Sequence, residues 1–280
     1  MKRISVVDEL HNKVFDFYDN NLGTILRSFE GFEYADVKSA VEDIPGKPGA
    51  AYLTSSFGRR IFSWSGDLLN GDVYALRREM LSPMRQSGNI KLIKFTTYDD
   101  LELQCFAEIT KVVSPYTHSV NSFLIEVVSP DWRFYSQEPG TFSIGQSIAF
   151  GGAEIAIDIP LEIPVEAGEG STVGTATNEG NDETDPFFTI TGPGTDFTIR
   201  NETTDKEFIL TTTLLAGEYV EVDVLNRTVK LNGVTNIYSD FSGDFFSLEP
   251  GDNEISFLSA SGWDDDTNLA LSFRHAYNGI

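Results

Sequence analysis

The spacing of hydrophobic residues in the first half of the chain is mostly that of β-strands. Residues 101–113 alternate between apolar and polar side chains, which predicts a strand with one buried face. Residues 90–98 carry apolar side chains on both faces, as expected for a strand covered on both sides. Asp99-Asp100 is predicted to form a tight turn between these two strands. A third strand is predicted over residues 120–128, and residues 52–56 and 60–64 are predicted to form a pair separated by a short turn. The first half therefore predicts a β domain.

One helix is predicted within this domain, over residues 73–81, where apolar side chains recur at helical spacing. Arg77 and Arg78 are expected to face outward. Asp72 stands where an N-cap residue would accept the first free backbone N–H groups, and Pro83 marks the end of the helix.

The second half of the chain consists of short apolar runs separated by turn residues. Asn232-Gly233 is a strong hairpin signal between two of them. The strands are predicted over residues 142–150, 187–191, 197–201, 208–214, 219–225, 228–231, 254–258 and 269–277. This spacing predicts a β-sandwich or jelly roll. Residues 167–186 are expected to form a projecting loop with one weak strand near residues 172–177.

Charge divides the chain at the same place as the strand pattern. The net charge is −23; residues 1–135 contain 15 Lys and Arg against 18 Asp and Glu, whereas residues 136–280 contain 5 against 25. This change predicts two domains, 1–135 and 136–280. The acidic half is expected to repel nucleic acid and anionic membranes, and its charge suits solubility at high local copy number.

The single cysteine and the N-terminus limit the other possibilities. Cys105 lies on the apolar face of its predicted strand, so we expect a buried small hydrophobe and no disulfide. The N-terminus resembles the start of a signal peptide, but Asp8 and Glu9 interrupt it before an apolar core forms. We therefore expect a soluble protein without Sec-type export and without membrane insertion.

The sequence offers little for catalysis. It lacks a Gly-x-Ser-x-Gly motif, a phosphate loop and a dinucleotide fingerprint. His11, His118 and His275 lack the spacing of a zinc site, and each is expected to be a surface or packed histidine. We predict no catalytic residues and no cofactor.

One acidic turn near the C-terminus is the best candidate for a small ligand. Asp264, Asp265 and Asp266 could bind calcium, but the run lacks the alternation that aims oxygens at one centre, so a solvated turn is the default prediction. The adjacent Trp263 is a candidate for stacking on a sugar ring, and equally for packing at the edge of the core.

The second half also resembles a known family. The segment from Asn178 to Pro186, followed by Phe187 to Gly194, resembles the siphophage distal tail protein family. The order of turn and strand residues continues to match over about a hundred residues, through 199–204, 215–223, 229–233, 246–253 and 271–280. The first half resembles the family more loosely, at Arg59-Arg60 and at Leu76 to Arg78.

The resemblance implies a mostly β protein, with a tail-tube-like N-terminal domain that carries one helix and a galectin-like C-terminal sandwich. It implies a structural virion protein, not an enzyme, that forms a hexameric ring between the tail tube and the tip or baseplate. The implied partners are the tail tube protein, the hub or tail-associated lysin, the tape-measure protein and receptor-binding proteins. DNA would pass through the ring lumen, and assembly in the bacterial cytoplasm would leave the protein at the virion tail tip.

A ring subunit needs residues that contact its neighbours. The strand near residues 90–98 has two apolar faces, and a cluster of basic residues could meet an acidic neighbouring subunit. The predicted subunit-interface residues are Ile90, Leu92, Ile93, Phe95, Arg77 and Arg78. The basic cluster also contains Arg59, Arg60, Arg85, Lys91 and Lys94.

Two other functions remain open from the sequence. The first is a carbohydrate-binding adhesin that grips host cell-wall glycan through the C-terminal sandwich. The second is a small glycan-degrading enzyme, which would need two carboxylates about 5–9.5 Å apart in a cleft.

Overall fold

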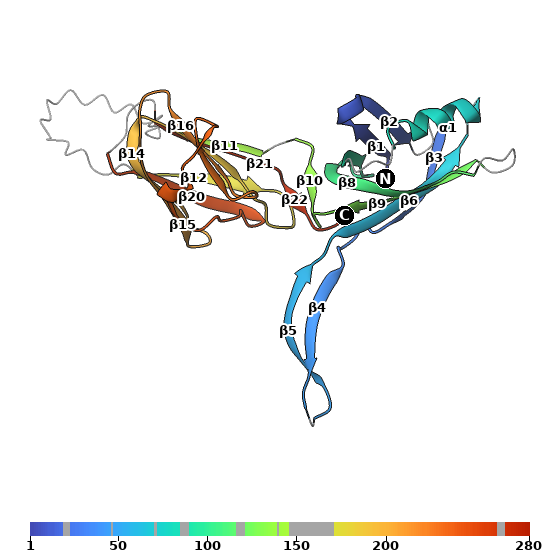
Figure 1. Cartoon of the computed structure of the whole chain (residues 1–280), viewed down its shortest axis with the longest axis horizontal. Coiled ribbons are helices and arrows are strands. Elements are labelled where there is room, and N and C mark those ends of the chain that lie inside the picture. The colour runs from blue at the N-terminus through green and yellow to red at the C-terminus, as the bar shows by residue number, and fades with distance from the viewer. Residues whose placement is uncertain are drawn as a thin grey trace, which may run out of the picture. The chain divides into compact units, whose positions relative to one another are not determined.

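The computed structural model describes residues 1–18, 23–45, 47–69, 72–84, 90–115, 121–138, 140–145, 171–261 and 267–280. The chain divides into two compact units (Figure 1). Unit 1 contains Met1–Glu138 and Ala276–Ile280, and unit 2 contains Pro139–His275. The structure is mostly β, which confirms the predicted fold class.

Unit 1 is built on one antiparallel sheet with the strand order β2-β1-β7-β8-β9-β6-β3. Its strands are β1 (Arg3–Asp8), β2 (Lys13–Tyr18), β3 (Thr24–Glu30), β6 (Arg60–Leu68), β7 (Lys91–Thr96), β8 (Glu102–Val113) and β9 (Ser122–Ser129). The short 3-10 helix η1 (Glu9–His11) joins β1 to β2. The predicted Asp99-Asp100 turn joins β7 to β8, and Asp100 has a φ of 67°.

Aromatic side chains dominate the core of unit 1. Trp64 of β6 is fully buried and lies in T-shaped contact with Phe17 of β2, their ring centroids 5.9 Å apart. Phe134 packs edge-on against Phe95 at 4.8 Å. Rings in such edge-to-face contact add about 0.5–1.5 kcal/mol per pair to the stabilisation from burial. The sheet of unit 1 therefore packs against one cluster of aromatic side chains.

The predicted helix is confirmed as α1 (Val73–Leu81). The Asp72 carboxylate accepts the backbone N–H groups of Tyr74 and Ala75, at 3.0 and 3.1 Å, as the N-cap prediction required. Met80 is fully buried and attaches the helix to the core. No helix among the described residues is both long enough and apolar enough to cross a membrane.

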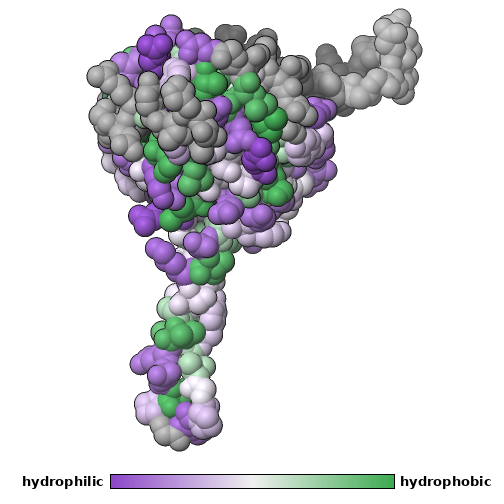
Figure 2. Space-filling model, turned by 90° about the vertical axis from the view of Figure 1, so that its right-hand side faces the viewer, coloured by the Kyte–Doolittle hydropathy of each residue, from purple (hydrophilic) through white to green (hydrophobic). Residues whose placement is uncertain are grey.

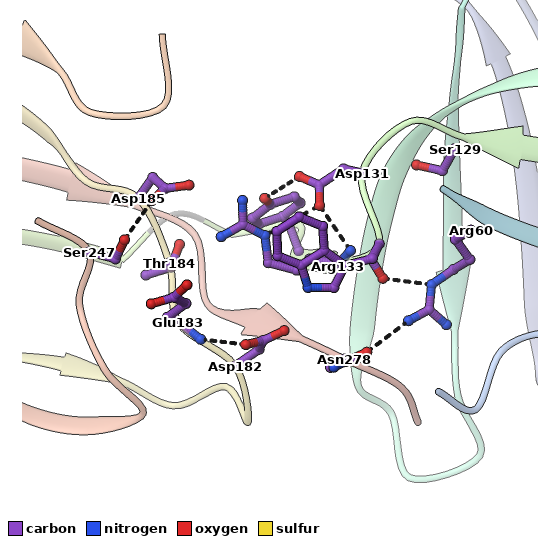
Figure 3. Close-up of polar contacts among 12 residues, drawn as sticks. Arg60, Ser129, Asp131, Arg133, Asp182, Glu183, Thr184, Asp185, Ser247 and Asn278 are labelled. Atoms are coloured by element: carbon purple, nitrogen blue, oxygen red, sulfur yellow. Dashed lines mark hydrogen bonds and ion pairs between the residues drawn. The ribbon is translucent and has the colours of Figure 1, made fainter. Parts of the chain in front are cut away.

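The end of the chain returns to unit 1. Strand β22 (Ala276–Tyr277) pairs with β10 (Phe134–Ser136), so the last residues belong to unit 1 although the sequence division placed them in 136–280. Arg60 fastens this return (Figure 3): its guanidinium donates to the Asn278 side chain at 3.4 Å and to the Trp132 carbonyl at 2.7 Å.

A two-stranded hairpin extends from unit 1 (Figure 1). It consists of β4 (Val37–Asp43) and β5 (Ala50–Phe57), and neither strand is hydrogen-bonded to any other strand that the structure describes. The prediction that residues 52–56 pair with 60–64 is wrong. β5 instead pairs with β4, and β6 pairs with β3 and β9, because Gly58 and Arg59 carry the chain from the hairpin into the sheet rather than turning it back.

Unit 2 is a sandwich of two antiparallel sheets, β11-β21-β13-β16-β17-β18 and β12-β20-β14-β15-β19. The first contains β11 (Gly140–Gly145), β13 (Phe187–Thr191), β16 (Tyr219–Asp223), β17 (Thr228–Leu231), β18 (Thr235–Asn236) and β21 (Asn268–Phe273). The second contains β12 (Ser171–Asn178), β14 (Gly194–Asn201), β15 (Lys206–Leu214), β19 (Phe241–Gly243) and β20 (Gly251–Ser259). The predicted last strand, 269–277, is divided between β21 and β22.

Buried asparagines hold the turns of unit 2. Asn253 is fully buried; its amide donates to the Glu249 carbonyl at 2.8 Å and accepts the Glu249 N–H at 3.0 Å. Asn201 donates to the same Asn253 oxygen at 3.2 Å. Asn178 is also fully buried, and it donates to the Asp182 carbonyl at 2.8 Å. The asparagines of the family-like turns are thus structural.

Replacing Asn253 by alanine is expected to destabilise unit 2 by about 2–4 kcal/mol, because several buried backbone groups lose their partner at once. Urea denaturation with hydrogen exchange on unit 2 peptides would measure the loss. Asn236→Ala is the matched control, since Asn236 is exposed and the hydrogen bond that its side chain accepts, from the Tyr238 N–H at 2.9 Å, is exposed too. An equal, small effect of both substitutions would contradict the role of Asn253.

Candidate interaction surface

The described residues hold no group of three or more His, Cys, Asp or Glu side chains that could bind a metal ion. Cys105 is 2% exposed, and burial raises the pKa of its thiol far above the usual value. His275 Nδ1 accepts the Glu179 backbone N–H at 3.0 Å, which gives it a structural role. Neither residue is in a setting suited to catalysis.

Several of the predicted site residues lie outside the part of the chain that the structure describes. These are Trp263, Asp264, Asp265 and Asp266, together with His118 and Arg85. The calcium and glycan-stacking roles of the first four stay predictions.

The predicted interface strand is an inner strand of unit 1. β7 is hydrogen-bonded to β1 on one side and to β8 on the other, so it has no free edge for a neighbouring subunit. Ile93 and Phe95 are 0% and 1% exposed, and Leu92 is 8% exposed. We therefore remove these three from the interface: an apolar strand with two buried faces here reflects burial within the same chain.

The other predicted interface residues lie on the surface. Ile90, just before β7, is 58% exposed. On α1, Arg78 is exposed and Arg77 is half-buried. Their role in an interface stays a prediction.

The basic residues do not form one patch. Arg60 is 2% exposed and Lys91 is 1% exposed, so both belong to the interior of unit 1. Arg59, by contrast, is exposed. Two of the charges that the sequence grouped on one surface therefore stabilise the fold instead.

The surface best suited to a partner is the β4–β5 hairpin. The cross-strand register places Val37 opposite Phe57 and Val41 opposite Tyr52. Because the register shifts by one residue at Leu53, all four side chains lie on the same face of the hairpin. Their exposed fractions are 56%, 39%, 62% and 63%. The opposite face carries small and polar residues, including Lys38, Ala40, Glu42, Ala51 and Thr54.

The base and the tip of this hairpin are both held in place. At the base, the Phe57 ring stacks on Trp132 with centroids 5.7 Å apart, and the Gly58 N–H donates to the Asp36 carbonyl at 3.0 Å. At the tip, the Ile44 N–H donates to the Gly49 carbonyl, and Gly49 has a φ of 110°. Figure 2 shows the hairpin as a projection with exposed hydrophobic surface along it.

Sequence reasoning missed the first strand of this hairpin. Residues 37–43 have too few apolar side chains to stand out, and the signal that could have found them is the Pro- and Gly-rich run at 45–49. Such a run between two β-like segments is a turn signal.

Comparison with known proteins gives two family matches. Residues 20–129 match the phage tail protein RIFT-related domain, and residues 179–277 match the C-terminal domain of siphovirus-type tail components. No curated protein sequence is significantly similar to the chain.

Solved structures also resemble the chain. The crystal structure of the Dit protein of phage SPP1, described as a paradigm of the hub adsorption apparatus in phages that infect Gram-positive bacteria, has a TM-score of 0.64 at 13% identity and covers 98% of both chains. Two structures of the phage P2 baseplate in its activated conformation, with Ca and with Sr, have TM-scores of 0.48 and 0.46 at 10% and 12% identity. The former covers 100% of both chains and the latter 99%.

The two matched domains, in this order and over most of the chain, define a structural component of a siphophage tail. The chain belongs to the siphophage distal tail protein family, which confirms the resemblance drawn from its turn residues. The protein is accordingly a component of the virion tail and baseplate hub.

Proposed function

We propose that the protein is a non-enzymatic ring subunit, six copies of which join the tail tube to the tip or baseplate. The ring would form in the host cytoplasm during tail assembly, and DNA would pass through its lumen. Unit 2 would present docking surfaces to the hub or tail-associated lysin and to receptor-binding proteins. The tube and tape-measure proteins would meet the ring at its lumen and its tube-facing side.

The observation that carries this proposal is the apolar face of the β4–β5 hairpin. An isolated two-stranded hairpin is at best marginally stable in water. Val37, Val41, Tyr52 and Phe57 lie on one face of it, and no described strand of the chain pairs with either of its edges. Exposed apolar surface of this kind marks an interaction site.

A neighbouring copy of the chain is the occupant that we propose for this face. Every subunit of a closed ring carries the same hairpin and the same receiving surface, so a single contact type repeats until the ring closes. Covering the apolar face against a neighbour supplies the stabilisation that the hairpin lacks in isolation.

The proposal predicts the effect of charge on this face. The wild-type chain is expected to form an assembly with a mass near six times 31.0 kDa at high concentration, whereas the double variant Val41→Asp/Tyr52→Asp stays monomeric. Buried unpaired carboxylates would cost an interface several kcal/mol, about enough to abolish association. Light scattering over a concentration series measures the mass.

The matched control carries the same two charges on the opposite face of the hairpin, as Ala40→Asp/Ala51→Asp. This variant is expected to assemble like the wild type. A wild-type mass equal to that of Val41→Asp/Tyr52→Asp at every concentration would contradict ring formation through this face.

A further inference from the structure

Unit 2 contains a hollow that the proposed ring does not use. It has a volume of about 360 Å³ and lies between the turn that joins β16 to β17 and the segment 238–245, which includes the short 3-10 helix η2 (Tyr238–Asp240) and the edge strand β19. The side chains that line it come from Arg227, Tyr238, Phe241, Ser242, Asp244 and Phe245.

Three nearly parallel aromatic rings form one wall of this hollow. The Phe241 and Phe245 rings stack with centroids 4.2 Å apart and an interplanar angle of 18°. The Tyr238 ring lies 6.0 and 6.1 Å from them, at 26° and 19°. Phe241 in turn stacks on the buried Phe208 at 5.3 Å. The wall is therefore anchored in the core, while Tyr238 remains 51% exposed.

The polar groups of the hollow are free to bind a ligand. Among the described residues, the side chains of Arg227, Ser242 and Asp244 form no hydrogen bond or ion pair with another part of the chain. The turn that carries Arg227 is fixed in its backbone: Arg227 has a φ of 51°, and the neighbouring Asn226 N–H donates to Asp223 at 2.9 Å, while the Arg227 side chain itself is exposed. The hollow thus combines a rigid aromatic wall with unpaired donors and acceptors.

This combination fits one chemical class of ligand. The negative face of an aromatic ring attracts the weakly positive C–H face of a pyranose. The hydroxyl groups at the edge of the sugar could then donate to a carboxylate and accept from a guanidinium, as Asp244 and Arg227 offer. A purely apolar ligand would leave these two groups without a partner in the ligand.

The negative charge of unit 2 favours neutral over anionic carbohydrates. Residues 136–280 contain 25 acidic against 5 basic residues, so the potential around unit 2 opposes the approach of anionic wall polymers. We infer that the hollow formed by Tyr238, Phe241, Phe245, Arg227 and Asp244 is a binding site for a neutral pyranose. The inference does not depend on ring assembly, because every lining residue comes from unit 2 of a single chain.

Saturation-transfer NMR on the full-length chain tests the inference. The probes are methyl β-galactoside, methyl α-glucoside, N-acetylglucosamine and rhamnose, with galacturonate as the anionic counterpart of galactose. At least one neutral sugar is expected to bind with a Kd on the order of millimolar, with the strongest transfer to its C–H protons. Galacturonate is expected to bind more weakly than methyl β-galactoside.

Substitutions of the lining residues test whether the sugar binds in the hollow. Tyr238→Ala is expected to weaken binding about tenfold, the size expected for the loss of one stacked ring. Asp244→Asn and Arg227→Gln are each expected to weaken it, whereas Tyr34→Ala, at a 75% exposed tyrosine of unit 1, leaves it unchanged. Three outcomes would overturn the inference: no transfer to any neutral sugar, tighter binding of galacturonate, or binding that Tyr238→Ala does not alter.

Discussion

Arg60→Met is expected to destabilise unit 1 by about 3–5 kcal/mol, because it removes a buried guanidinium that donates to several partly buried carbonyl groups. The wild-type guanidinium donates to the carbonyls of Trp132, Gly31 and Glu33 at 2.7, 3.1 and 3.1 Å. It also lies 4.2 Å from the centroid of the Phe134 ring. Arg60 therefore joins the 31–33 loop, the end of β9 and the C-terminal return in one contact network.

The substitution is also expected to release the end of the chain. Asn278 loses its hydrogen bond to Arg60, while the β10–β22 pair and the hydrogen bond from the Ile280 N–H to the Phe32 carbonyl, at 3.2 Å, are among the contacts that remain. Hydrogen exchange should therefore rise in residues 276–280 before unit 1 unfolds.

Urea denaturation followed by tryptophan fluorescence, with hydrogen exchange to separate the two units, would measure both effects. Arg59→Met is the matched control, because Arg59 is adjacent and exposed. Arg60→Lys should recover only part of the loss, since an ammonium cannot reproduce the planar fork of donors. A loss below about 1 kcal/mol for Arg60→Met would contradict the network.

Lys91→Met is expected to have the second large effect, a loss of about 3–5 kcal/mol of stability at neutral pH. The substitution leaves the buried carboxylate of Asp8 without its cationic partner. Lys91 Nζ lies 2.9 Å from Asp8 Oδ2, and the two side chains are 1% and 2% exposed. His11 Nδ1 lies 2.8 Å from the same oxygen. The double variant Asp8→Leu/Lys91→Met removes both charges and should regain most of the lost stability.

The pH dependence of this pair follows from the pKa of Asp8. Burial by itself would raise that pKa, but the contacts with Lys91 and His11 outweigh burial and hold it below the usual value of 3.8. The folded state therefore gains stability from ionised Asp8 above pH 3.8, and loses it as the pH falls through the lowered pKa.

Urea denaturation at pH 7 and at pH 3 distinguishes this mechanism from simple packing loss. The wild type and Lys91→Met should differ less in their free energy of unfolding at the lower pH. There, protonation of Asp8 begins to leave Lys91 of the wild type as an unpaired buried charge. Lys94→Met is the control, because Lys94 lies on the same strand and is half-buried. A difference that is independent of pH would contradict the ion-pair origin.

The elements that the sequence predicted well are those whose signal is local. The N-cap at Asp72, the turn at Asp99-Asp100 and the alternation of β8 each depend on a few neighbouring residues. The family-like asparagines also repeat a local turn chemistry, and the structure shows why: their side chains satisfy backbone groups of their own turns.

The elements that the sequence predicted poorly depend on which strands become neighbours. Residues 90–98 have the composition of a strand buried on both faces, but composition does not tell whether the covering strands belong to the same chain or to another. Arg60 and Lys91 look like surface charges, and only the tertiary structure shows that carbonyl groups and a carboxylate compensate them in the interior.

The sequence by itself determined that the protein is mostly β, that its net negative charge is concentrated in the second half, and that its turn pattern is that of a distal tail protein. These properties come from residue spacing and composition, which need no long-range information. The tertiary structure decided that the β4–β5 hairpin stands outside the sheet, that residues 276–280 rejoin unit 1, and that Tyr238, Phe241 and Phe245 stack beside Arg227. The return of residues 276–280 depends on contacts between residues far apart in the chain, and the other two depend on which strands pair with which, which local patterns do not encode.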